Sequence, residues 1–140
     1  MKCIKKLNIS LEDSIILAKE AIKIATEKGF KICATVVDSS GVQIVSLRDD
    51  LANQITPESS FKKAYTAVAI KNPTLMMVNG MEKNPTLAQF SEINNNTIVY
   101  GGGVPIISEN EVVGAIGIAG APGGDKDNNI AEEAIAKILY

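Results

Sequence analysis

The 140-residue chain contains no histidine and no tryptophan, and the missing histidine excludes the most chemistry. Without an imidazole base, the chain cannot form the Ser-His-Asp or Cys-His arrangements of nucleophilic catalysis. Histidine is also the commonest metal ligand and a common axial ligand of haem iron. Histidine-dependent hydrolysis and histidine-ligated metal or haem are therefore excluded.

Cysteine is almost as scarce, with only Cys3 and Cys33 in the chain. Two cysteines far apart in sequence do not make a structural zinc site, and they do not indicate a disulfide framework. Cys33 lies inside an apolar run, which is typical of a buried small hydrophobe. We therefore expect no metal site, and a reducing cytoplasm is the expected location.

Long apolar runs and clusters of one charge are also missing. Every apolar run is broken well before the roughly 20 residues of a membrane-spanning helix, and the basic residues 1–6 are not followed by the apolar core of a secretory signal. The net charge is −2 with both signs interspersed, so no basic stripe favours nucleic acid. We expect neither a membrane nor a nucleic acid as partner.

The residues that are present indicate one globular domain over residues 1–140. Hydrophobic residues make up 46% and charged residues 21% of the chain, a globular rather than disordered composition. A chain of this length can form one core without disulfides or metals.

The first half of the chain predicts a helix, a β-hairpin and a second helix. Ser10 begins the first helix as a capping residue, and Gly29 ends it. Residues 32–38 and 42–47 are predicted strands joined by a turn. Thr56 is the expected N-cap of the second helix, with Pro57 at its first position.

The second half predicts further helices and three strands. Thr74 is expected to cap a short helix after Pro73, and residues 81–96 form either a mobile cover over a site or a plain connector. The expected strands are residues 98–100, 104–107 and 112–119, and a final amphipathic helix carries Ile130, Ala134 and Ile138. Pro105 must lie at a strand start, an edge or a bulge.

This order predicts a three-layer α/β/α sandwich of the α+β type. Hairpin-length connections make the five-stranded sheet mainly antiparallel. The apolar run at 32–38 indicates that helices cover both faces of the sheet.

Two glycine-rich segments are candidates for ligand contact. Gly101, Gly102 and Gly103 allow either a tight corner between strands, which is favoured, or close approach of a ligand. Residues 120–125 resemble a phosphate cradle before a helix. There, however, Asp125 is the natural N-cap, and its carboxylate would repel an anion, so a capped helix is favoured.

Several side chains allow a structural or a functional interpretation. Arg48, the only arginine, follows the second strand beside acidic residues, so it favours a structural ion pair over a clamp for a carboxylate such as a haem propionate. Lys63 follows Lys62 in a pattern typical of a solvated face. Non-histidine iron donors are available but are more typical of core or terminal positions; they are Cys3, Tyr65, Met76, Met77, Met81 and Tyr100.

Three stretches together carry a family resemblance. They are Leu11-Glu12-Asp13 with Val36-Val37-Asp38 and Gly41; Lys63-Ala64-Tyr65-Thr66-Ala67 with Pro73-Thr74; and Gly101-Gly102-Gly103-Val104-Pro105-Ile106 with residues 113–117 and 120–127. The order and spacing of these motifs, from about Leu7 to Leu139, resemble the GlcG/HbpS-like proteins, also called the haem-degrading domain family. The chain is also similar to the C-terminal part of cobalamin adenosyltransferases of propanediol utilisation.

The resemblance implies a profilin-like fold, a homo-oligomer between dimer and octamer, and a haem or corrinoid ligand. It also implies cofactor-binding positions, with Arg48 and Asp49 matching an Arg-x-Asp region only loosely. These positions are Arg48, Lys63, Thr66, Gly101, Gly102, Gly103, Pro105 and Asp125. Some haem-binding relatives hold iron through histidine, so haem in this chain would need another ligand or binding without strong ligation.

Three functions follow, of which a small-ligand-binding protein is favoured, with haem or a related tetrapyrrole as the leading ligand class. The second is an enzyme of unknown reaction on a small carboxylic acid, in which Arg48 orients the substrate and Asp38 or Asp125 transfers protons. No assembled nucleophile, base or metal set supports it, and its catalytic residues are unknown. The third is an accessory subunit of a diol or glycolate utilisation system.

Overall fold

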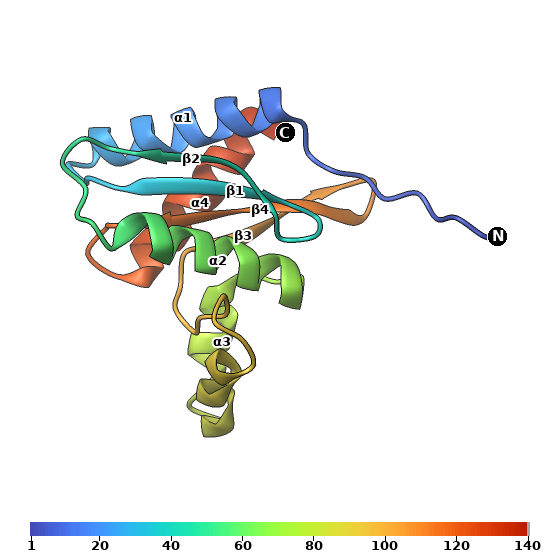
Figure 1. The fold of residues 1–140 in the computed structure, drawn as a ribbon. Helices are drawn as coiled ribbons and strands as arrows, with labels where there is room; N and C mark the ends of the chain where they lie inside the picture. The colour runs from blue at the N-terminus through green and yellow to red at the C-terminus, as the bar shows by residue number, and fades with distance from the viewer. Residues whose placement is uncertain (140) are drawn as a thin grey trace.

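A computed structural model describes residues 1–139 as one layered unit of helices and a sheet (Figure 1). Its elements are α1 (Leu11–Glu27), β1 (Cys33–Asp38), β2 (Gln43–Arg48), α2 (Thr56–Ile70), α3 (Thr74–Gly80), the 3-10 helix η1 (Pro85–Glu92), β3 (Gly103–Ser108), β4 (Glu111–Ala119) and α4 (Gly124–Leu139). None of the helices among these residues is both long enough and apolar enough to cross a bilayer.

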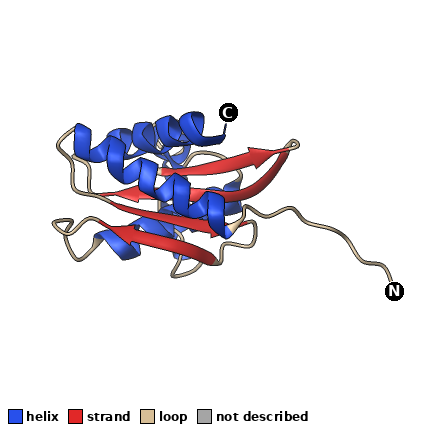
Figure 2. Ribbon diagram, turned by 90° about the horizontal axis from the view of Figure 1, so that it is seen from above, coloured by secondary structure: helices blue, strands red, loops and turns tan. Residues whose placement is uncertain are grey.

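The sheet lies between two helical layers. Its strand order is β2-β1-β4-β3, and every neighbouring pair is antiparallel. Helices α1 and α4 pack together on one face, and α2 covers the other (Figures 1 and 2). The predicted antiparallel sheet and three-layer α+β arrangement are therefore confirmed.

Each face of the sheet has its own apolar core. The larger core lies under α1 and α4, and its fully buried members include Leu17, Ile24, Val36, Ile116, Ile118 and Ile130. The smaller core lies under α2 and consists of Val37, Ala64, Ala67 and Ala115 with Phe61 and Val68 against them. Small side chains dominate this second core, so α2 lies close to the sheet.

The prediction of five strands is wrong, because the sheet has four. Residues 98–100 do not pair with any strand. The backbone N–H of Ile98 donates instead to Thr66 Oγ1 on α2, at 3.0 Å. A side-chain oxygen therefore accepts the hydrogen bond that a neighbouring strand would accept in a sheet. Pro105 lies in β3, an edge strand of the sheet, as predicted.

The expected helix ends are partly confirmed. Ser10 Oγ accepts from the Asp13 N–H at 3.1 Å, and Gly29 follows α1 with a φ of 82°. Thr56 is the first residue of α2 rather than its N-cap, because its hydroxyl donates to Asn53 O at 2.8 Å. Thr74 likewise begins α3 instead of capping it, and its hydroxyl bonds elsewhere.

Residues 74–97 project from the α2 side of the sandwich (Figure 1). The segment contains α3 and η1, which contact each other, and η1 buries none of its side chains. Thr97 is buried again where the chain returns to the body. Part of the stretch 81–96, for which the sequence predicted either a cover or a connector, is thus a helical projection.

The backbone of β4 lies in direct contact with α2 at Gly117. A Cβ atom built on Gly117 would lie 1.9 Å from Ser60 O and 2.7 Å from Ala64 N. Both neighbours are backbone atoms, which cannot move without shifting the helix. Glycine at this position therefore sets the distance between the sheet and α2.

We predict that Gly117→Ala lowers the free energy of unfolding by about 3 kcal/mol, because the added methyl overpacks this contact. Gly29→Ala is the control, since a Cβ at Gly29 meets nothing within 4 Å. It should lose only about 1 kcal/mol through its left-handed backbone. Urea unfolding followed by circular dichroism measures both, and equal losses would contradict the close packing of α2 on β4.

Candidate functional site

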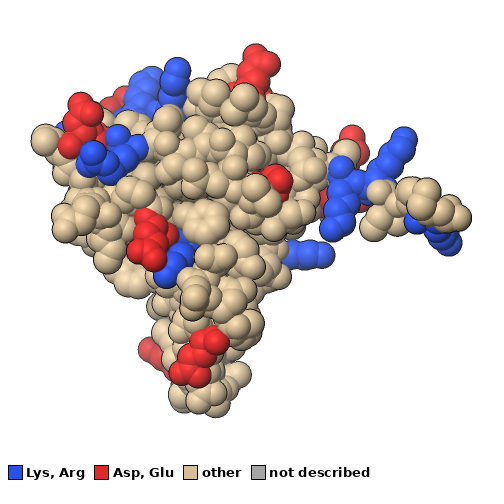
Figure 3. Space-filling model, in the orientation of Figure 1, with Lys and Arg blue, Asp and Glu red and all other residues tan. Residues whose placement is uncertain are grey.

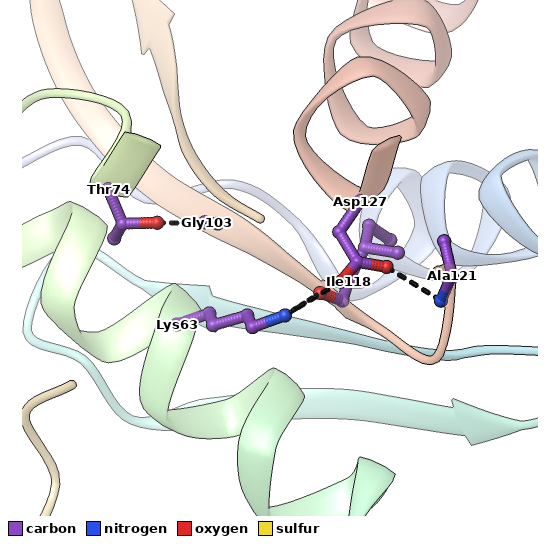
Figure 4. A network of polar contacts seen from close by, with 6 residues as sticks. All are labelled: Lys63, Thr74, Gly103, Ile118, Ala121 and Asp127. Carbon is purple, nitrogen blue, oxygen red and sulfur yellow. Dashed lines mark hydrogen bonds and ion pairs between the residues drawn. The ribbon is translucent and has the colours of Figure 1, made fainter. Parts of the chain in front are cut away.

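A buried ion pair between α2 and α4 lies at the centre of the site (Figure 4). The side chain of Lys63 is 1% exposed and that of Asp127 is 2% exposed. Lys63 Nζ donates to Asp127 Oδ2 at 2.9 Å and to Ile118 O, at the end of β4, at 2.9 Å. The backbone N–H of Ala121 donates to the other carboxylate oxygen at 3.0 Å. The pair thus joins α2, β4 and α4.

The local sequence explains why Asp127 faces inward. Gly123 has a φ of 123°, which turns the chain into α4 immediately before Gly124. Asp127 falls in the first turn of α4, and its N–H donates to Gly123 O at 3.1 Å. A carboxylate in the first turn is stabilised by the positive end of the helix dipole.

Burial dominates the electrostatics of both partners. Desolvation lowers the pKa of Lys63, although the charge and hydrogen bond of Asp127 act in the opposite direction. Desolvation raises the pKa of Asp127 against the effects of Lys63 and the Ala121 amide. Each charge is therefore held in the interior by its partner and would be costly to leave alone.

The glycine triplet packs against this pair. Gly102 has a φ of 127°, and a Cβ built on it would lie 2.5 Å from Ile118 O, 2.9 Å from Asp127 Cβ and 3.0 Å from Lys63 Cδ. The next residue, Gly103, donates its N–H to Thr74 Oγ1 at 3.0 Å (Figure 4). The triplet is a corner that only glycine fits, as the favoured interpretation predicted.

Tyr100 covers the ion pair from the solvent side. Lys63 Nζ lies 4.6 Å from the centroid of the Tyr100 ring, a cation–π distance. The residue is nevertheless 49% exposed. Tyr100 therefore presents an open aromatic surface at the protein boundary while its ring rests on a buried cation.

Tyr100 borders two cavities, which together we call the Tyr100 cleft. One has a volume of about 390 Å³, and its lining includes Asn53, Ile55, Thr56, Ser59, Ile98 and Ala121. The other has a volume of about 480 Å³, and its lining includes Leu75, Val78, Met81, Val99, Gly101 and Asp125. Both volumes fall in the range of roughly 300–1,000 Å³ that is typical of small-ligand pockets.

Most of the predicted site residues lie in or behind this cleft. Gly101 and Asp125 line the larger cavity, and Lys63 lies under the smaller one. Thr66 positions the segment that leads to Tyr100 through its bond to Ile98. The other triplet residues and Pro105 continue from the cleft into β3.

Two predictions about site residues, those for Lys63 and Asp125, are wrong in the structure. Lys63 is buried, so the interpretation of Lys62 and Lys63 as a solvated face is wrong for Lys63. Asp125 lies within the first turn of α4 and is exposed, so it is not the N-cap.

Arg48 lies outside the cleft. Its Nη1 donates to Ala52 O at 2.7 Å and lies 3.5 Å from Asp49 O, and it lines neither cavity of the cleft. Arg48 thus holds the loop after β2 through backbone carbonyls, and the predicted structural ion pair is wrong, because Arg48 forms none within residues 1–139. A role for it in ligand binding stays a prediction.

Asp127 is the residue of the candidate site that sequence reasoning missed. A signal was present on α2, because Thr56, Ser60, Lys63 and Ala67 recur at helical spacing and are all buried. A lysine on that buried stripe requires an anionic partner. Asp125 and Asp127 both follow the glycine loop, and only the folded structure shows that Asp127 is the partner of Lys63.

The described part of the chain has no cluster of three or more His, Cys, Asp or Glu side chains that could hold a metal ion. The donors that face the cleft are instead a phenol, at Tyr100, and a thioether, at Met81. Both are known axial ligands of haem iron in proteins.

This chain matches one family model and several solved structures along nearly its whole length. The family described as haem degrading protein HbpS-like matches residues 9–136. A crystal structure of a double mutant of Streptomyces reticuli HbpS superposes with a TM-score of 0.90 at 30% identity, covering 99% of this chain and 92% of that one. The crystal structure of a PduOC:heme complex gives a TM-score of 0.86 at 27% identity, covering 95% and 96%.

A longer relative matches in sequence. The corrinoid adenosyltransferase PduO of Citrobacter freundii is 30% identical over 133 residues, which is 94% of this chain but 39% of that protein. This chain therefore corresponds to about two fifths of the adenosyltransferase.

We predict that Lys63→Met lowers the free energy of unfolding by about 3–5 kcal/mol, because it leaves the Asp127 carboxylate buried and unpaired. The double variant Lys63→Met/Asp127→Asn should recover most of the loss, since no charge then remains. The control is Lys62→Met, whose exposed pair with Glu58 at 3.1 Å contributes about 0.5 kcal/mol. Urea unfolding tests the set, and a double variant no more stable than Lys63→Met would contradict a charge-based role.

Proposed function

This chain belongs to the HbpS-like family of haem-degrading proteins, and on that premise we propose that it binds haem or a related tetrapyrrole in the Tyr100 cleft. The observation that carries the proposal is the half-exposed Tyr100 ring, which separates two cavities and rests on the Lys63 ammonium. A planar ligand could stack on this ring, as aromatic groups do when their centroids lie about 4.5–7 Å apart.

The lining of the cleft fits the chemistry of such a ligand. The larger cavity is mainly apolar, with Leu75, Val78 and Val99 against Met81, and suits the face of a macrocycle. The smaller cavity carries the Ser59 hydroxyl and the Asn53 side-chain amide. These groups could bond the carboxylates at the rim of a tetrapyrrole.

Iron, where the ligand is haem, would be held without histidine. The thioether of Met81, which lines the larger cavity, is the donor that could hold it. When bound, haem would supply its redox and oxygen chemistry. This chain's residues would orient it, keep one face dry and hold the ion pair beneath it.

The relatives support the ligand class. One structural neighbour is a complex with haem, and a longer relative is a corrinoid adenosyltransferase, so both relatives point to tetrapyrroles. A carboxylic-acid enzyme is less well supported, because Arg48 and Asp125 do not meet in one cavity.

We predict a saturable red shift of the Soret band when ferric haem is titrated into the purified protein, with one fixed stoichiometry per chain. Cobinamide, a corrinoid without the nucleotide loop, should compete if the cleft accepts both macrocycles. The absence of a saturable change with either compound at low micromolar concentration would overturn the proposal.

We predict further that Tyr100→Ala weakens haem binding about tenfold or more, because it removes the stacking surface, a loss of about 1.4 kcal/mol. Tyr100→Phe should retain most affinity, because it keeps the aromatic ring on which the ligand stacks. Tyr65→Phe is the matched control, since Tyr65 lies on α2, lines neither cavity and bonds to Asn94. Unchanged binding in Tyr100→Ala would place the ligand elsewhere.

A further inference from the structure

The first seven residues form an extended arm that runs outward from the rest of the chain (Figures 1 and 3). Its apolar side chains are exposed, with Met1 at 119%, Ile4 at 80% and Leu7 at 39%. Holding such an arm extended in water costs conformational entropy, and no buried apolar contact offsets that cost. The arm therefore has the properties of a segment that is buried by another surface.

The root of the arm is rigidly held. Asn8 Oδ1 accepts from Ser39 N at 2.9 Å and from Ser39 Oγ at 2.6 Å. Ile9 donates its N–H to Val113 O at 2.9 Å. These bonds aim the arm outward from the β3–β4 hairpin, away from its own sheet (Figure 1).

A groove of about 590 Å³ begins at the same root. It runs between the start of α1 and the end of the β3–β4 hairpin, and its lining includes Leu7, Asp13, Ile106, Ile107, Glu109 and Val113. The floor is thus apolar, and the rim is acidic. Within residues 1–139 neither Asp13 nor Glu109 forms an ion pair.

The arm and the groove are complementary in charge. Residues 1–7 carry Lys2, Lys5 and Lys6, and none of these lysines pairs with an acid in the described part of the chain. The groove offers Asp13 and Glu109 beside apolar side chains that suit Ile4 and Leu7. Of the arm only Leu7 lines its own groove, and the residues before it extend outward from the body (Figure 1), which leaves the groove open to a second chain.

We propose that two copies of this chain exchange their arms, each arm lying in the groove at the root of the other. Because arm and groove adjoin at Leu7, a two-fold axis near this residue lets both arms cross and dock at once, which is a self-complementary contact. Seven extended residues reach about 23 Å, enough to lie along the partner's hairpin end. This inference does not rest on the proposed ligand.

The native Cys3 allows a direct test. In the variant Ser108→Cys, a new thiol lines the groove, whereas Cys33 is buried and cannot react readily. Mild oxidation should give a dimer on a non-reducing denaturing gel that dithiothreitol reverses. Ser91→Cys, on the exposed face of η1, is the matched control and should stay monomeric on the gel, as should Cys3→Ser/Ser108→Cys.

A second measurement uses the unmodified protein in solution. Sedimentation should show a dimer or a larger even-numbered assembly whose dissociation constant rises at least tenfold in Ile4→Asp, and rises with salt because the contact is charged. Ile93→Asp, which alters an exposed apolar residue on the projection, should leave the constant unchanged. The Ile4 change lies outside the folded body, so it should not affect folding.

Three outcomes would overturn the proposal. One is an intrachain disulfide in Ser108→Cys, which would place the arm in its own groove. Another is a wild-type protein that sediments as a monomer or an unchanged assembly in Ile4→Asp. The third is co-sedimentation of the arm with anionic phospholipid vesicles in the absence of any disulfide-linked dimer, which would assign the arm to a membrane surface.

Discussion

The buried ion pair of Lys63 and Asp127 is the interaction on which the site depends. Its two charges lie 2.9 Å apart with almost no exposure, and burial moves the pKa of each toward its neutral form. Such a pair stabilises little compared with apolar packing, but it enforces one arrangement of its surroundings. Here it fixes the spacing of α2, the end of β4 and the start of α4, which lie on both faces of the sheet.

The cleft follows from this constraint. With the pair in place, Gly102 approaches within contact of both side chains, and Tyr100, two residues earlier, lies over the ammonium. The aromatic ring then separates an apolar cavity from a more polar one. An open aromatic surface above a buried charge suits a flat, largely apolar ligand with polar edges, which is the chemical description of a tetrapyrrole.

The sequence predicts most helices and strands, but neither the helix starts near Thr56, Thr74 and Asp125 nor the distant pairings. The ends of α1 follow from cap residues that act within one turn, and the antiparallel layers follow from short connections and apolar runs. The stretch 98–100 has the composition of a strand but loses its backbone donor to the Thr66 hydroxyl. The partner of Lys63 lies 64 residues away, and periodicity within one helix indicates that a partner is needed without identifying it.

The central claim is that the tetrapyrrole lies on Tyr100 above the ion pair, and amide NMR with a diamagnetic zinc porphyrin tests it most directly. Ring-current shifts should concentrate on residues 53–59, 75–81, 98–101 and 120–125, the segments that border the cleft. Shifts that concentrate instead on the N-terminal arm, on the groove beside Glu109 or on the loop at Arg48 would contradict it.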